Sequence, residues 1–126
     1  MSLVGEAAVD DYIAALPPDQ REALTNLRAR LKALLPDHVE VLSYAMPGLR
    51  QPGSKGKMVV GYAAFARHLG LYPHSGTVIP QIDCTPFRTS KSGVLFTPDR
   101  PLPDALLTRI IATRQAELAV GYGRKA

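Results

Sequence analysis

Three segments carry apolar residues at the three- and four-residue spacing of an amphipathic helix. The first covers residues 9–16 and ends at the proline pair 17–18. The second starts at the same prolines, which suit a first helical turn, and stops before Pro36. The third covers residues 104–120. The apolar face of the second helix consists of Leu24, Leu27, Leu31 and Leu34.

Between these helices the pattern changes to that of strands. Residues 39–44 alternate in polarity, as a strand with one buried face does. Residues 58–66 form the most apolar run, and such a run needs cover on both faces, so it belongs in the middle of a sheet. Further strands are expected at residues 49–50, 69–72 and 94–97, with a bend or bulge at 46–48 and a polar loop at 87–93.

These elements predict an α+β fold, in which an antiparallel sheet of about five strands carries the N- and C-terminal helices on one face. A chain of 126 residues fits one domain, which we expect to cover residues 4–120, with residues 121–126 as a frayed tail. Its hydrophobic content of 46% is typical of a globular protein. No run approaches the roughly 18 apolar residues of a membrane span.

The composition sets two further expectations. Cys84 is the only cysteine, so no disulfide forms within the chain, and with no signal peptide visible this favours a cytoplasmic protein. The net charge of +4 is uneven, because residues 50–100 hold seven basic and two acidic side chains. This excess either attracts an anion or keeps the loops soluble. No basic motif interleaved with aromatic residues is present, which disfavours a nucleic-acid partner.

Seven short stretches together resemble one known family, the YdhG-like domain of unknown function. They are residues 9–13 (VDDYI), 16–18 (LPP), 43–47 (SYAMP), 63–65 (AAF), 68–73 (HLGLYP), 89–93 (TSKSG) and 101–103 (PLP), in order along the chain. The resemblance implies helices on one side of an antiparallel sheet, in a frataxin-like arrangement. It also implies a possible role as an intracellular iron chaperone that delivers iron to an accepting protein, with iron as the only cofactor it suggests.

Iron sites of this type use exposed carboxylates, because iron prefers oxygen ligands there. Glu6, Asp10 and Asp11 lie close together in the sequence, but acidic residues in a first helical turn are usually solvated charges. A second conceivable metal set is His68, His74, Asp83 and Cys84. Their spacings match no compact ligand motif.

A pocket for a small ligand or an anion is the alternative function. Aromatic and thioether side chains with a few polar groups are typical of small-ligand sites, and a lysine with two hydroxyls and a glycine backbone can hold an anion. The candidate ligand-binding residues are Tyr44, Met46, Pro47, Phe65, His68, Tyr72, Thr89, Ser90 and Lys91. Taken singly, each of them is better explained by a structural role, with Tyr44, Met46 and Phe65 in the core and Lys91 closing a loop by capping carbonyls.

The sequence favours a binding or carrier protein over an enzyme. It contains no nucleophile elbow, phosphate-binding loop, dinucleotide fingerprint or paired-cysteine zinc motif. A small enzyme would have to use the rim formed by Tyr44, His68 and Lys91. No catalytic residue is therefore assigned.

Overall fold

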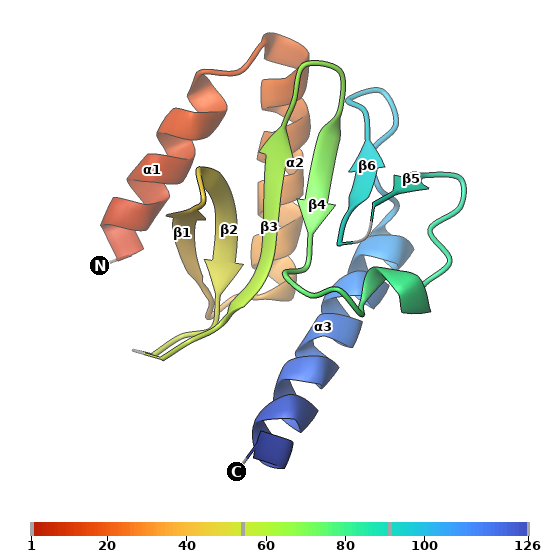
Figure 1. Ribbon diagram of the computed structural model, residues 1–126. Coiled ribbons are helices and arrows are strands. Elements are labelled where there is room, and N and C mark those ends of the chain that lie inside the picture. The colour runs from red at the N-terminus through yellow and green to blue at the C-terminus, as the bar shows by residue number, and fades with distance from the viewer. Residues whose placement is uncertain (1, 54, 91, 126) are drawn as a thin grey trace.

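The computed structural model describes residues 2–53, 55–90 and 92–125. Within them the chain forms three α-helices, one short 3-10 helix and six strands (Figure 1). The helices are α1 (Ser2–Ala14), α2 (Pro18–Leu34), η1 (Ile79–Gln81) and α3 (Asp104–Lys125). The strands are β1 (Val39–Ser43), β2 (Met46–Arg50), β3 (Met58–Ala64), β4 (Leu69–Tyr72), β5 (Arg88–Thr89) and β6 (Val94–Phe96). None of the helices in these residues is long and apolar enough to cross a membrane.

The strands form one sheet in the order β1-β2-β3-β4-β6-β5, and every neighbouring pair is antiparallel. β3 lies inside this sheet, which confirms the prediction made from its apolar run. The register between β2 and β3 shifts after Leu49, which pairs with Val60, while Arg50 pairs with Met58. Val59 is the extra residue of this bulge, and both Val59 and Val60 are fully buried.

One face of the sheet carries the core. Pairing brings alternate residues of the four inner strands into one apolar layer, which contains Leu49, Val60, Tyr62, Leu69, Leu71, Val94 and Phe96. The predicted leucine stripe of α2 joins the same cluster, together with Val9 and Ile13 of α1 and Leu107, Ile110 and Ile111 of α3. In Figure 1 α2 and α3 lie behind the sheet, and α1 lies at its β1 side. The predicted α+β class is confirmed.

Several predicted boundaries shift by one or two residues, and four predictions about the elements were wrong by more than that. α1 starts at Ser2 instead of Val9, and Gly5 makes this possible, because a Cβ there would collide with the carbonyl oxygen of Glu40 on β1. Residues 46–48 form the start of β2 instead of a bend. A proline is tolerated there because the pairing of β2 with β3 begins only at Gly48, so Pro47 need not donate a hydrogen bond to β3. The polar loop 87–93 contains the two-residue strand β5, which brings the strands to six. α3 runs to Lys125 rather than Val120, while fraying of residues 121–126 stays a prediction.

A buried ion pair connects α2 to β1. Glu40 is the one buried charged residue among those that the structure describes, and its side chain is 3% exposed. Arg28 donates two hydrogen bonds to the Glu40 carboxylate, from Nε to Oε2 at 2.7 Å and from Nη2 to Oε1 at 2.8 Å. Arg28 also reaches Asp10 of α1 at 2.6 Å. The hydrogen bond to Glu40 raises the pKa of Arg28 above its ordinary value, so the guanidinium is charged at neutral pH.

Replacing Arg28 with methionine is expected to destabilise the protein by about 3 kcal/mol, because the buried Glu40 carboxylate then keeps only Lys32, 3.5 Å away. Urea unfolding at pH 7 measures this. The control is Asp10→Asn, which removes a partner that is 62% exposed and should cost less than about 1 kcal/mol. If the two variants lose equal free energy of unfolding, the buried Arg28–Glu40 pair contributes no more to stability than the exposed Arg28–Asp10 pair does.

Candidate functional site

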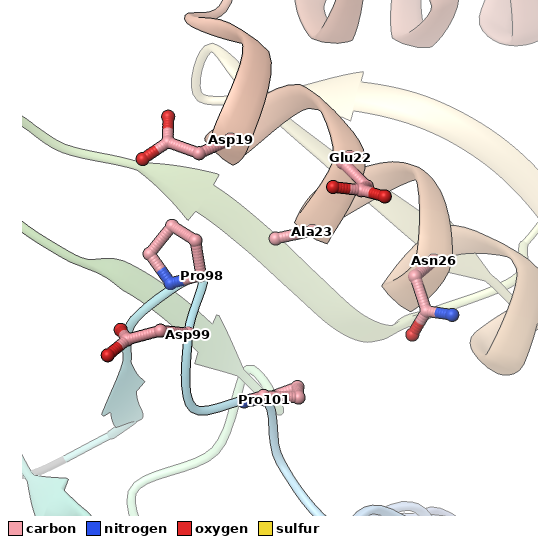
Figure 2. A pocket seen from close by; sticks show the side chains of 7 residues that line it. All are labelled: Asp19, Glu22, Ala23, Asn26, Pro98, Asp99 and Pro101. Carbon is pink, nitrogen blue, oxygen red and sulfur yellow. The ribbon is translucent and has the colours of Figure 1, made fainter.

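A groove of about 580 Å³ lies between α2 and the connection from β6 to α3. Figure 2 shows its two walls. One wall is the N-terminal half of α2, with Asp19, Glu22, Ala23 and Asn26; the other consists of Pro98, Asp99 and Pro101. Its volume lies within the range of roughly 300–1,000 Å³ that is typical of small-ligand sites. We refer to these seven residues as the α2 groove.

The helical period of α2 positions the first wall. Leu24, Leu27 and Leu31 are fully buried against the sheet, so residues 19, 22, 23 and 26 fall on the flank beside that stripe. Asp19 also suits the first turn of the helix, where its carboxylate accepts a hydrogen bond from the backbone N–H of Gln20 at 2.8 Å.

A tight turn builds the second wall. The backbone N–H of Arg100 donates to the carbonyl of Thr97 at 3.0 Å, which places Pro98 and Asp99 at the two central positions of the turn. Leu102, 1% exposed, anchors the following residues in the core. Arg30 of α2 holds this wall in place, because it donates to the carbonyl of Leu102 at 2.7 Å and to Asp104 at 2.9 Å.

The electrostatic character of the α2 groove is acidic. Asp19, Glu22 and Asp99 are all exposed, and none of them pairs with a basic side chain within the described ranges. Between these carboxylates the surface is apolar, formed by Ala23 and the rings of Pro98 and Pro101. A ligand with a positive charge next to an aliphatic portion therefore complements the groove.

Two predicted site residues lie near the N-terminal end of the α2 groove. The turn from β3 to β4 is held to the helices by Gln20, whose Nε2 donates to the carbonyl of Phe65 at 2.7 Å, and by Tyr12, whose hydroxyl accepts from the N–H of Ala64 at 2.9 Å. Phe65 is 41% exposed, and its ring stacks on His68 with centroids 4.9 Å apart. Because Gln20 adjoins Asp19, the turn that carries this stacked pair lies next to the first turn of α2.

Tyr44, Met46 and Pro47 occupy the other hairpin at that end of the sheet. Ser43 pairs with Met46, so Tyr44 and Ala45 alone make the turn, with φ of 53° and 62°. Two positive φ values are typical of a type I′ turn, which normally uses Asn and Gly. Tyr44 is 89% exposed, and the neighbours Met46 and Pro47 point to opposite faces of the sheet. The structure therefore does not place these three side chains in one pocket.

Tyr72, Thr89 and Ser90 lie toward the opposite end of the sheet. Tyr72 pairs with Gly61, three residues from the β3–β4 turn, which is about 10 Å along the strand. Its ring lies over Gly70 and Gly93, where any Cβ would collide with it. Thr89 and Ser90 line a separate hollow of about 390 Å³ with Cys84. Lys91 lies outside the described residues.

The conceivable metal ligands are also dispersed. His68 stacks on Phe65, whereas His74 follows β4 at the other end of that strand, where burial and the charge of Arg114 lower its pKa. Burial raises the pKa of the Cys84 thiol. Asp10 forms a salt bridge with Arg28. Across residues 2–53, 55–90 and 92–125, no three His, Cys, Asp or Glu side chains gather closely enough to hold a metal ion.

Outside the α2 groove, a polar cluster of Ser75, Thr77 and Glu117 connects the loop after β4 to α3. The hydroxyls of Ser75 and Thr77 both donate to the Glu117 carboxylate. Burial alone would raise the pKa of Glu117, but these two hydrogen bonds and the charge of Arg114 outweigh it and hold the pKa below its usual 4.5. We interpret this cluster as structural, since it satisfies its own donors and acceptors.

The overall structure has a counterpart of known family. The chain shares its fold with a protein of the DUF1801 family, YdhG from Bacillus subtilis. The crystal structure of that protein superposes with a TM-score of 0.79 and 16% identity, over 90% of this chain and 92% of the other. At this identity the likeness establishes the fold, which is the YdhG-like α+β fold that the sequence resemblance implied, while the frataxin-like arrangement stays an expectation. No protein-family model matches the sequence, and no curated protein matches it.

Sequence reasoning missed the α2 groove. Nothing in the sequence alone singled out Asp19 or Glu22 as part of a site, or residues 98–103 as its second wall. One signal was available: Asp19, Glu22 and Asn26 recur at spacings of three and four beside the leucine stripe. That spacing marks a common flank of the helix, but only the fold reveals that a second wall faces it.

Ala45→Gly is expected to stabilise the protein by about 1 kcal/mol, because a left-handed conformation disfavours residues with a Cβ and suits glycine. Thermal or urea unfolding measures the change. The matched control is Ala29→Gly in the exposed interior of α2, which should destabilise by about 1 kcal/mol. Loss of stability in both variants would mean that the turn does not have this geometry.

Glu117→Gln is expected to lower stability at pH 7, and the difference from the native chain should vanish in acid. A carboxyl whose pKa is depressed on folding stabilises the native state above its unfolded pKa, near 4.5, and loses this contribution as the pH falls through the folded value. Urea midpoints between pH 3 and 7 test this. Glu22→Gln makes the same chemical change at an exposed position of α2, and an equal loss in that variant would contradict the role of the hydroxyl contacts.

Proposed function

We propose that this protein is a small binding module that holds an organic cation, an amine or a guanidinium, in the α2 groove. The observation that carries the proposal is the presence of three carboxylates, without basic partners among the described residues, around the apolar surface of the α2 groove. A binding or carrier role also agrees with the absence of enzyme motifs in the sequence.

The physical basis is complementarity of both charge and surface. An alkylammonium or alkylguanidinium has an apolar stem and a charged end, as the side chains of Lys and Arg do. The stem would lie on Ala23, Pro98 and Pro101, and the charged end would reach Glu22 and Asp99. The Phe65–His68 pair beside the groove supplies an aromatic face for a second cationic group.

Iron carriage, the function that the family resemblance implies, is the competing possibility. The carboxylates of the α2 groove are not among any set of three that would hold a metal ion, and those near the N-terminus are partly engaged by Arg28. We therefore favour organic cations over iron. The remaining predicted rim residues, Tyr44, Met46, Pro47, Tyr72, Thr89, Ser90 and Lys91, do not enter this site, and their role in binding stays a prediction.

Calorimetric titration with arginine amide, a dication, tests the proposal. We expect saturable binding by the native chain, and a loss of about fivefold for each of Glu22→Gln and Asp99→Asn, because one exposed charge contact is worth up to about 1 kcal/mol. Affinity should also fall as the salt concentration rises.

Two controls make this test specific. Citrulline amide matches arginine amide in shape but has an uncharged side chain, so it should bind at least fivefold more weakly. Asp11→Asn removes an exposed carboxylate from α1, outside the groove, and should leave binding unchanged. Equal affinity for the two amides would overturn the proposal. Ferrous iron, titrated anaerobically, should bind no tighter than it does to an unrelated acidic protein.

A further inference from the structure

The α2 groove does not end at Asn26 and Pro101. These two residues also line a second hollow of about 360 Å³, together with Arg30, Leu102, Pro103 and Asp104. Arg30 and Asp104 in turn line a third hollow of about 340 Å³, with Ala33, Leu34, Leu107 and Thr108. Consecutive hollows share residues from both walls, and Arg30 crosses between the walls there through its hydrogen bonds to Leu102 and Asp104. We treat the three adjoining hollows as one furrow along α2, which we call the α2 furrow.

The furrow is long enough for an extended chain. On α2 it runs from Asp19 to Leu34, and at 1.5 Å per residue this is about 22 Å. An extended polypeptide advances about 3.3 Å per residue, so about seven residues would span it. A single amino acid or a short amine would fill only one of the three hollows.

The two ends of the furrow differ in chemistry. The end at the α2 N-terminus carries Asp19, Glu22 and Asp99. The far end is mainly aliphatic, with Ala33, Leu34 and Leu107. A polyamine is charged along its whole length and would not match the aliphatic end. A polypeptide segment with basic residues at one end and an aliphatic residue at the other matches both.

The charge balance supports a basic partner. Along the furrow four carboxylates face one guanidinium, that of Arg30, which is already held by Asn26, Leu102 and Asp104. This leaves three negative charges. The positive ends of α2 and α3 both lie here and offset about half a charge each. About two negative charges therefore remain to attract a cationic segment.

We propose that the α2 furrow binds an extended polypeptide segment in which Lys and Arg side chains occupy the Asp19–Asp99 end and an aliphatic side chain occupies the Leu34–Leu107 end. This inference rests on the proposed function, since it names the class of partner for the same site. The wall of residues 98–103 suits such a ligand, because the prolines that line the hollows offer apolar contact along it.

Fluorescence titration with acetyl-Lys-Arg-Ser-Gly-Ser-Ser-Leu-amide tests the inference. We expect this peptide to bind at least tenfold tighter than arginine amide. Replacing its Leu with Ser, or shortening its spacer to one residue, should remove most of that gain, because the far hollow is then left empty. Replacing Lys with norleucine and Arg with citrulline should abolish binding.

Protein variants separate the two ends. Ala33→Gln places a polar side chain in the far hollow and should weaken the peptide about fivefold without changing the affinity for arginine amide. Ala29→Gln, at an exposed position of α2 outside the lining, should change neither, and circular dichroism checks that both variants fold.

Three outcomes would overturn the inference. If the peptide binds no tighter than arginine amide, the inference is wrong and the proposed function is unaffected. Absence of binding by both ligands would end both proposals. Self-association of the chain in sedimentation experiments, displaced by the peptide, would mean that the furrow takes a second copy of this protein instead of a foreign segment.

Discussion

The burial of one sheet face against α2 is the interaction on which the rest of the structure depends. Val60 and Tyr62 of β3 are buried, and Leu24, Leu27 and Leu31 of α2 belong to the same cluster. Burying side chains of this size stabilises a fold by roughly 1.5–3 kcal/mol each. The rotation of α2 about its axis is therefore fixed, and with it every other position on that helix.

The α2 furrow and the Arg28–Glu40 pair are both consequences of that fixed rotation. Arg28 lies on one side of the leucine stripe and reaches Glu40 on β1. Asp19, Glu22 and Asn26 lie on the other side, where the β6–α3 connection passes. One helix thus supplies a buried ionic contact to β1, an ion pair to α1 and an open acidic flank to the surface.

The sequence predicted those parts of the fold that local pattern controls. The leucine stripe of α2, the interior strand β3 and the apolar face of α3 follow from periodicity, and all are in the core. The start of α1 and the course of β2 depend instead on distant contacts, namely the approach of Gly5 to Glu40 and the end of the β2–β3 ladder at Gly48. No local pattern encodes such contacts.

The candidate site was less predictable, because it depends on which end of the sheet each residue reaches. Tyr72 and Phe65 are seven residues apart and look like members of one rim, yet β4 separates them along its length. Asp19 and Asp99 are eighty residues apart and line one groove. The chain also has a net charge of +4, so its overall composition conceals a locally acidic surface. A binding surface is defined by local charge, since screening limits each charge to about 10 Å at moderate salt.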